Sequence, residues 1–325
     1  GFSPVFLFAP TDRLLFEAAL DVGIGTDDTN SSSTSVDLTI ANASVIISDN
    51  LIIGGGLFVV PFGQYHNHFD PPWINKLPDD PIIFDDNTAP GSEVGFFAKG
   101  VYPVSFVRKF LPSAKFTYDL YLANGPNLIT SDPGAAGQLN FSDYTDLNNG
   151  KAAGGRFAFL PHPNVEFGYS IQYSQTSPNG FPHVHALLQA ADFNWVQECR
   201  PLGGVVTTRA EWVWSQVESA TYDPTGSLGF GPVRVGEWIQ GGYCTIAYRP
   251  TLIGNEFLRN TEYIFRYDTQ RSPLSSPGGD HETRYTLGVD YWLTPSWVLK
   301  AAYEFDNKKL GEAQSAFYLQ LGLGF

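Results

Sequence analysis

The C-terminal stretch alternates strictly between two kinds of side chain. Every odd position from 317 onwards carries a large apolar group: Phe317, Leu319, Leu321, Leu323 and Phe325. The even positions hold Ala, Tyr, Gln and Gly, so the two faces of an extended segment differ completely. A period of two is the period of a β-strand. A strand with one wholly apolar face is typical of a wall between hydrocarbon and water, and a water-soluble protein would leave that face exposed.

The same alternation recurs along most of the chain. In 165–173 and in 297–305, apolar residues hold the odd positions, and all charged residues fall on the other face. The pattern predicts fourteen strands, at 13–25, 34–46, 51–62, 92–104, 114–123, 151–160, 165–174, 184–198, 205–219, 236–249, 259–271, 282–293, 297–307 and 315–325. The predicted fold class is therefore all-β: a transmembrane antiparallel β-barrel of about 14 strands, within a range of about 12 to 16.

Composition supports strands rather than helices as the membrane-crossing elements. Aromatic residues make up 15% of the chain and charged residues only 16%, below the roughly 25% charge of an average soluble domain. No uninterrupted apolar run reaches the roughly 18 residues that a transmembrane helix needs. The net charge of −14 excludes nucleic acid as a partner, because nucleic-acid binding requires a basic surface.

The connections between the predicted strands differ in length. Those at 161–164 and 294–296 are short, whereas 63–91 and 124–150 are long and rich in Gly, Pro, Asp and Asn. In outer-membrane barrels the short turns face the periplasm and the long loops face outwards. An even number of strands would also place both ends of the barrel on one side of the membrane.

On this interpretation the chain has two parts, a periplasmic N-terminal arm at 1–12 and the barrel at 13–325, although 1–12 could instead form a further strand. The longest connection, 63–91, is acidic, with a single Lys76 against five aspartates: Asp70, Asp79, Asp80, Asp85 and Asp86. Rings of carboxylates select cations. The segment is therefore predicted either to fold inwards as a constriction loop or to lie outside as a solvated extracellular loop.

Charged residues on the inward face of the predicted strands are candidates to line a water-filled lumen. Those predicted as pore-lining are Glu17, Asp21, Lys99, Asp119, Arg156, Glu166, Arg209, Glu211, Glu262, Arg266, Arg284, Asp290, Lys300 and Glu304. Over all predicted strands, inward acids outnumber inward bases by fourteen to eight. A net negative lumen favours cations. Fourteen strands should leave a narrow opening, since barrels of about 8 are filled by side chains and those of about 16 are open.

Four segments resemble the porin O/P family, outer-membrane barrels often described as phosphate-selective. They are 57–63, 72–78, 122–126 and 154–161, and their spacing is similar to that family across roughly 13–325. The resemblance implies a barrel of sixteen strands and a trimer. For a phosphate channel it also implies an array of Arg and Lys in the lumen. The mixed, net acidic lumen predicted here argues against carrying the phosphate label over.

The function predicted is that of a porin in the outer membrane of a Gram-negative cell. It would allow passive diffusion of small hydrophilic solutes or ions, non-specifically or with a preference for cations. The alternative is a structural or scaffold barrel that sheathes or docks a partner protein in an outer-membrane complex. Expected partners are outer-membrane lipid and lipopolysaccharide, small solutes or ions, and further copies of the chain in a homotrimer or a larger membrane complex.

No catalytic residue, metal site or cofactor is predicted. The His66-Asn67-His68 segment could present two ligands to a metal, but no third and fourth ligand is identifiable. His281 has serines nearby without an arrangement that defines a hydrolase, so we expect no enzyme activity. Cys199 and Cys244 could form a disulfide in an oxidising compartment or remain free.

Overall fold

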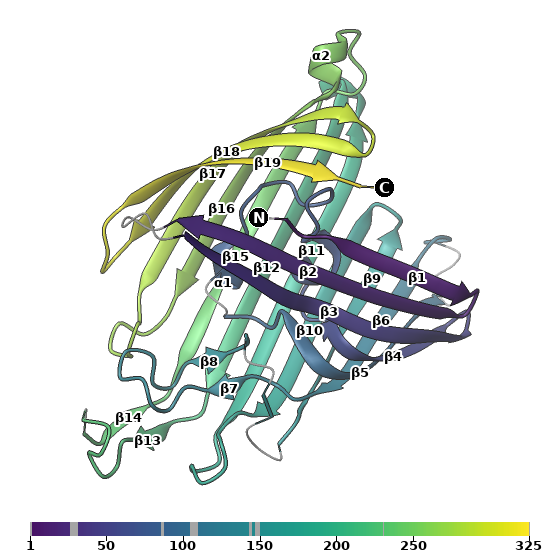
Figure 1. Cartoon of the computed structure of the whole chain (residues 1–325). Coiled ribbons are helices and arrows are strands. Elements are labelled where there is room, and N and C mark those ends of the chain that lie inside the picture. Colours follow the sequence, from purple (N-terminus) through teal and green to yellow (C-terminus); the bar gives the residue numbers. More distant parts are fainter. Residues whose placement is uncertain are drawn as a thin grey trace.

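One large antiparallel sheet dominates the computed structural model, which describes residues 2–26, 32–85, 88–104, 110–142, 145–146, 150–229 and 231–324 (Figure 1). Each of its fifteen strands is hydrogen-bonded to the next one along the chain. The strands are β1 (Val5–Thr11), β2 (Leu14–Thr26), β3 (Ser32–Ser48), β4 (Leu51–Val59), β5 (Ser92–Pro103), β6 (Lys115–Ala123), β9 (Ala152–His162), β10 (Val165–Gln175), β11 (His185–Cys199), β12 (Gly204–Val217), β15 (Trp238–Arg249), β16 (Thr261–Arg271), β17 (His281–Thr294), β18 (Trp297–Lys308) and β19 (Gln314–Leu323).

The all-β prediction is confirmed. All fourteen predicted strands are present, and their ends agree with the observed ones to within about three residues. Two short hairpins lie at the end of the sheet that carries the long connections. They pair β7 (Asn127–Leu128) with β8 (Leu139–Asn140), and β13 (Ala220–Tyr222) with β14 (Val233–Val235). The helix α2 (Glu256–Arg259) lies at the opposite end (Figure 1).

The predicted N-terminal arm at 1–12 is wrong, because Val5–Thr11 form the fifteenth strand, β1. This strand pairs with β2 in a register that sets Leu7 opposite Glu17. Residues 5–8 are all apolar, so they show no alternation by which a strand could be recognised. The odd strand count has a consequence: β1 and β19 both run from the end with the long connections to the end with the short turns. The first and last strands of the sheet therefore run parallel to each other.

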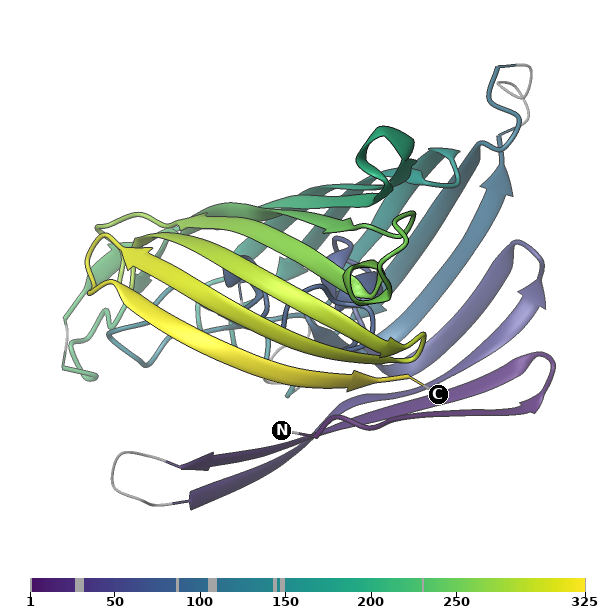
Figure 2. The same ribbon diagram turned by 90° about the horizontal axis from the view of Figure 1, so that it is seen from above.

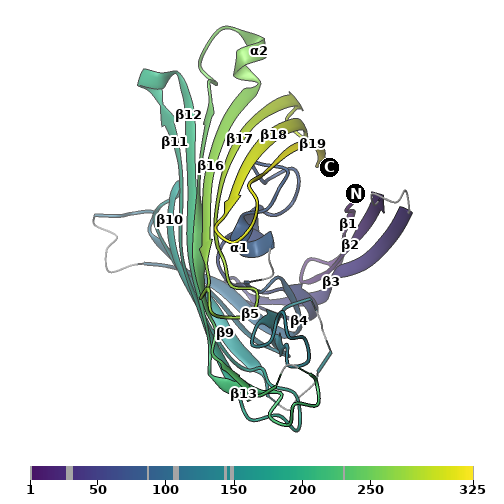
Figure 3. The ribbon, with the colours of Figure 1, turned by 90° about the vertical axis from the view of Figure 1, so that its left-hand side faces the viewer.

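The sheet curls until its two outer strands approach each other. Figure 2 shows β19 and the β1–β3 segment coming together, with the N- and C-terminal ends close to one another. No strand pairing between β1 and β19 is present among the described residues. The result is an incomplete cylinder with a convex outer face and a concave inner face (Figure 3).

Exposure on this sheet is the reverse of that in a soluble protein. On β10 the outward Phe167 and Tyr173 are 50% and 53% exposed, whereas the inward Ser170 and Gln172 are 0% and 1% exposed. Aromatic and branched residues favour extended backbone, and in β10 they all lie on the convex side. In water such a surface would aggregate, but in hydrocarbon it is solvated, as in the lipid-facing band of outer-membrane barrels.

Two further observations complete the fold. Among the described residues, no helix is both long and apolar enough to span a bilayer. Cys199, at the end of β11, and Cys244, within β15, are both free thiols.

Candidate functional site

All fourteen charges predicted as pore-lining lie on the concave face. The strand registers connect them across the sheet through pairs that include Glu17–Asn42, Lys99–Asp119, Asp119–Arg156, Asp192–Glu211, Glu262–Asp290 and Asp290–Lys300. Eight of them are buried: Arg156, Glu211, Glu262, Arg266, Arg284, Asp290, Lys300 and Glu304. Glu17, Asp119, Glu166 and Arg209 are partly buried, and Asp21 and Lys99 are exposed.

The connection between β4 and β5, residues 60–91, folds into the concave side. It contains a π-helical turn at Tyr65–Phe69 and the short helix α1 (Ile82–Asp85), which Figure 3 shows inside the curl of the sheet. Val60 and Phe62 are fully buried in a cluster that also contains Val213 and Tyr243 of the sheet. Of the two arrangements predicted for this acidic segment, the structure therefore has the inward one.

The beginning of this segment is attached to the sheet by hydrogen bonds to Glu211. The Glu211 carboxylate accepts the backbone N–H groups of Gln64 and Tyr65 at 3.1 and 3.2 Å. Gly63 donates its N–H to the Ser170 hydroxyl at 2.9 Å. Gly63 has φ +67°, and a Cβ there would lie 1.5 Å from a Glu211 oxygen, so this approach requires glycine.

The second half of the segment is attached through Asp79. Its carboxylate accepts hydrogen bonds from the guanidinium groups of Arg284 at 2.9 Å and Arg266 at 3.1 Å. Arg266 also donates to the main-chain carbonyls of Asp79 and Asp80 at 2.6 and 2.9 Å. Removing one partner of a buried ion pair usually costs about 3–5 kcal/mol, so these contacts fix the segment to the sheet.

The other acidic residues of this segment have different surroundings. Asp80 accepts the Tyr65 hydroxyl at 2.7 Å, and Asp70 is about half exposed, with its carboxylate 3.9 Å from the His66 ring. Asp85 belongs to α1, but its side chain lies outside the described part of the structure, as does Asp86 altogether. The five aspartates were predicted to narrow the pore together. At least one of them, Asp79, instead attaches the segment to the sheet.

The charges beneath the docked segment are paired. Arg156 lies between Asp192 and Glu166, with nitrogen–oxygen distances of 2.6 and 2.7 Å. Lys76, from the segment itself, meets Glu262 of β16 at 2.7 Å. Buried charges require such partners. We call the concave face of β9 to β18, against which 60–91 packs, the docked side.

Part of the remaining concave face, on β2, β3, β5 and β6, stays accessible. We call it the open side. Asp21 and Asp37 lie directly opposite each other on β2 and β3, and both are exposed. Glu17 and Asp119 are partly exposed on the same face. The bases on this face are Lys99 and, nearer the turns, Arg13 and Lys115. Like charges in cross-strand contact repel each other.

Asp80 and His66 of the docked segment have shifted pKa values that matter between neutral and mildly acidic pH. Burial, assisted by the nearby Asp70 carboxylate, raises the pKa of Asp80 to about 6. Burial alone would lower the pKa of His66, but the Asp70 carboxylate outweighs burial and raises it above the ordinary value. Acidification from neutral pH therefore removes a negative charge and adds a positive one within the concave space.

This leads to a pH-dependent prediction for an open lumen. As the pH falls from about 8 to about 5, the cation-to-anion permeability ratio should decrease, with part of the change centred near pH 6, where Asp80 binds its proton. Reversal potentials in planar bilayers at a series of pH values measure this. The variant Asp80→Asn keeps an oxygen that can accept the hydrogen bond of the Tyr65 hydroxyl. In this variant the step in the permeability ratio near pH 6 should be missing. A step of full size in that variant would show that Asp80 is not its source.

Among the described residues, no group of three or more His, Cys, Asp or Glu side chains is arranged to hold a metal ion.

Comparison with known proteins identifies the fold. No protein-family model matches the chain, and no curated protein does. Among solved structures, an anion-selective porin from Comamonas acidovorans is similar at 12% identity over 100% of both chains, with a TM-score of 0.52. Salmonella typhi OmpF, in complex with daunomycin, is similar at 10% identity over 98% of this chain and 89% of that one, with a TM-score of 0.51.

A third similar structure is a loop-deletion mutant of OmpT, an outer-membrane protein of Vibrio cholerae. It is 9% identical over 99% of this chain and 89% of its own, with a TM-score of 0.50. At these identities the likeness shows the fold: the chain has the porin fold over its full length. Membership of the porin O/P family in particular stays a prediction.

Proposed function

We propose that the chain is an outer-membrane porin through which small hydrophilic solutes or ions diffuse passively. One observation carries the proposal: a long connection folds into the concave side of a porin-like sheet and is hydrogen-bonded to strands from β10 to β18, while Asp21 and Asp37 on β2 and β3 stay exposed. The apolar convex face supports a position in lipid, with lipopolysaccharide and lipid as its contacts. Assembly into a homotrimer or a larger membrane complex is part of the same proposal.

The preference we propose is for cations. Several carboxylates on the docked side are paired with Arg156, Arg266, Arg284 or Lys76, so these contribute little to the field along the path. The open side keeps the facing carboxylates of Asp21 and Asp37 accessible to solvent. Low-dielectric walls focus the field of such groups on passing ions. Three bases, Arg13, Lys99 and Lys115, lie on this side, and four carboxylates outnumber them: Glu17, Asp21, Asp37 and Asp119.

Ion selectivity tests the proposal. The purified protein in a planar bilayer under a tenfold KCl gradient should give a reversal potential of the sign for cations, with a permeability ratio of about 2 or more. The preference should weaken in concentrated salt, because the Debye length falls to about 3 Å at 1 M. Asp21→Asn combined with Asp37→Asn should reduce it, whereas Glu198→Gln, at a turn end of β11, should not. An anion-selective reversal potential would refute the proposed preference.

The alternative of a scaffold barrel draws on one specific observation. The concave side contains an extensive packed cluster that joins Phe62 and Phe84 of the docked segment to Val184, Val213 and Tyr222. If this packing closed the lumen, the barrel would enclose a solid interior and would serve to hold a partner protein. Ion conduction by the isolated protein separates the two functions, since a scaffold barrel gives none.

A further inference from the structure

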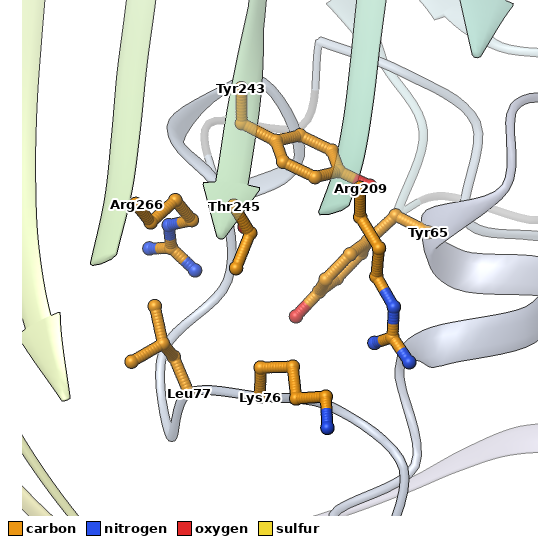
Figure 4. A pocket seen from close by; sticks show the side chains of 7 residues that line it. All are labelled: Tyr65, Lys76, Leu77, Arg209, Tyr243, Thr245 and Arg266. Carbon is orange, nitrogen blue, oxygen red and sulfur yellow. The ribbon is translucent and has the colours of Figure 1, made fainter. Parts of the chain in front are cut away.

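At Lys76 the docked segment packs closely against the sheet. The cavity between them has a volume of about 20 Å³, enough for about one water molecule. Side chains from the segment and from the sheet enclose it (Figure 4): Tyr65, Lys76, Arg209, Tyr243 and Arg266. A solute larger than water cannot pass between the segment and the sheet at this level, so its path runs along the open side.

The open side and the adjoining β1 differ from a purely polar wall, because alkyl side chains are exposed on them. Leu7 of β1 lies directly opposite Glu17 of β2, which places it on the concave face, and it is 67% exposed. Leu15 lies on the same face of β2, two residues before Glu17, and is 37% exposed. Ile46 of β3, two residues beyond the register partner of Leu15, is also exposed. Water in the lumen therefore meets an apolar surface here.

The carboxylates on the same strands have no cationic partners. In the described part of the chain, Glu17, Asp21 and Asp37 take part in no ion pair. Glu17 accepts a hydrogen bond from the side-chain amide of Asn42 at 3.3 Å, which leaves its charge uncompensated. Arg13 is the single base in the sequence of β1 to β3. The concave face of these three strands therefore keeps an excess of negative charge beside its alkyl groups.

The spacing of these groups suits one small molecule. Cross-strand neighbours such as Leu7 and Glu17 have Cβ atoms about 5 Å apart. Residues two apart along a strand, such as Leu15 and Glu17, are separated by about 7 Å. A molecule with a cationic group at Glu17 therefore reaches both leucines with a chain of a few methylene groups.

We propose that the solutes favoured on this side are small organic cations that carry an alkyl or aromatic group. The ammonium group of such a solute lies at Glu17, and its apolar part lies against Leu7 and Leu15. An inorganic cation gains only from the carboxylates and an apolar anion only from the leucines, whereas an apolar cation gains from both. The inference rests on the proposed pore and adds the class of solute that the pore favours.

Block of the potassium current by a series of n-alkylammonium ions tests the solute class. From ethyl- to hexylammonium, the concentration that halves the single-channel potassium current should fall by about 2-fold per methylene, as expected for a methylene that is half buried against the wall. N-methylglucamine is a cation with a hydrophilic body, and hexanoate is an anion with an alkyl chain. Each should require a concentration at least about 10-fold higher than hexylammonium.

Two sets of variants separate the apolar contact from the charge. Leu7→Gln combined with Leu15→Gln should raise the half-blocking concentration of hexylammonium by about 5-fold and that of N-methylglucamine by less than about 2-fold. Glu17→Gln should raise both by a similar factor of about 2- to 5-fold, the range for a solvent-exposed ion pair. Leu228→Gln makes the same change at an exposed leucine in the tip of the β13–β14 hairpin and should alter neither.

The outcomes distinguish this inference from the pore itself. A potassium current that hexylammonium and N-methylglucamine block equally would overturn the proposed solute class and leave the pore in place. Block by hexanoate as strong as that by hexylammonium would also overturn it, because charge would then play no part. The series on the unmodified protein decides this even if a variant does not fold. Inserted protein that carries no potassium current would refute the pore and this inference with it.

Discussion

Leu319→Arg should destabilise the barrel by roughly 2–4 kcal/mol, the cost of an arginine on the lipid face near the bilayer centre. Leu319 lies in β19, points outwards and is 68% exposed, so it has no protein partner that could compensate the charge. Urea titration of the protein folded into lipid vesicles, followed by tryptophan fluorescence, gives the change in the free energy of unfolding.

The matched control uses the same strand and the same new side chain. Ala316 points to the concave face, opposite Glu304 of β18 in the strand register. Ala316→Arg should therefore change the stability by less than about 1 kcal/mol, because the arginine meets water and a carboxylate. If both substitutions destabilised the protein equally, the convex face would not be the lipid face.

Removal of the docked segment should have the largest effect on conduction. Deleting residues 66–88 and joining the flanks with a short Gly/Ser linker should raise single-channel conductance by at least about twofold, because the segment occupies the concave space. The cation preference should also fall, since Asp70 and Asp80 are lost while Arg266 and Arg284 lose Asp79. The sheet should still form, because hydrogen bonds between strands hold it together.

A deletion elsewhere provides the control for this experiment. The tip of the β13–β14 hairpin, residues 224–229, is exposed, and shortening it should leave conductance and selectivity unchanged. Unchanged conductance after deletion of 66–88 would mean that this segment does not narrow the path. Loss of the folded barrel in that variant would instead assign the segment a structural role.

Alternation of side chains predicted the strands well because the environment on each face is uniform. In β10, for example, Glu166 to Ser174 point to the polar interior at every second position without exception. For β1 the sequence could not decide between a strand and an arm, for the converse reason: its four consecutive apolar residues give both faces the same character. β15 shows the alternation less clearly because Gly241 and Gly242 interrupt it.

The contacts that position the docked segment could not be predicted in the same way. Asp79 was recognised as acidic, but its partners Arg266 and Arg284 lie 187 and 205 residues away along the chain. Nothing in the local pattern indicates which arginine an aspartate will meet at such a separation. Tyr243 was missed as well, because its place on the concave face follows only from its register opposite Glu211.

Single-channel recording of the purified full chain tests most directly whether the barrel encloses a continuous water path. In planar bilayers, we expect discrete current steps with a linear current–voltage relation, and a larger step after deletion of 66–88. Membrane insertion must be shown independently: when the same protein is reconstituted into lipid vesicles, its strands should be protected from protease. Protein that is inserted and folded but gives no current steps, with or without residues 66–88, would contradict a diffusion pore and favour the scaffold barrel.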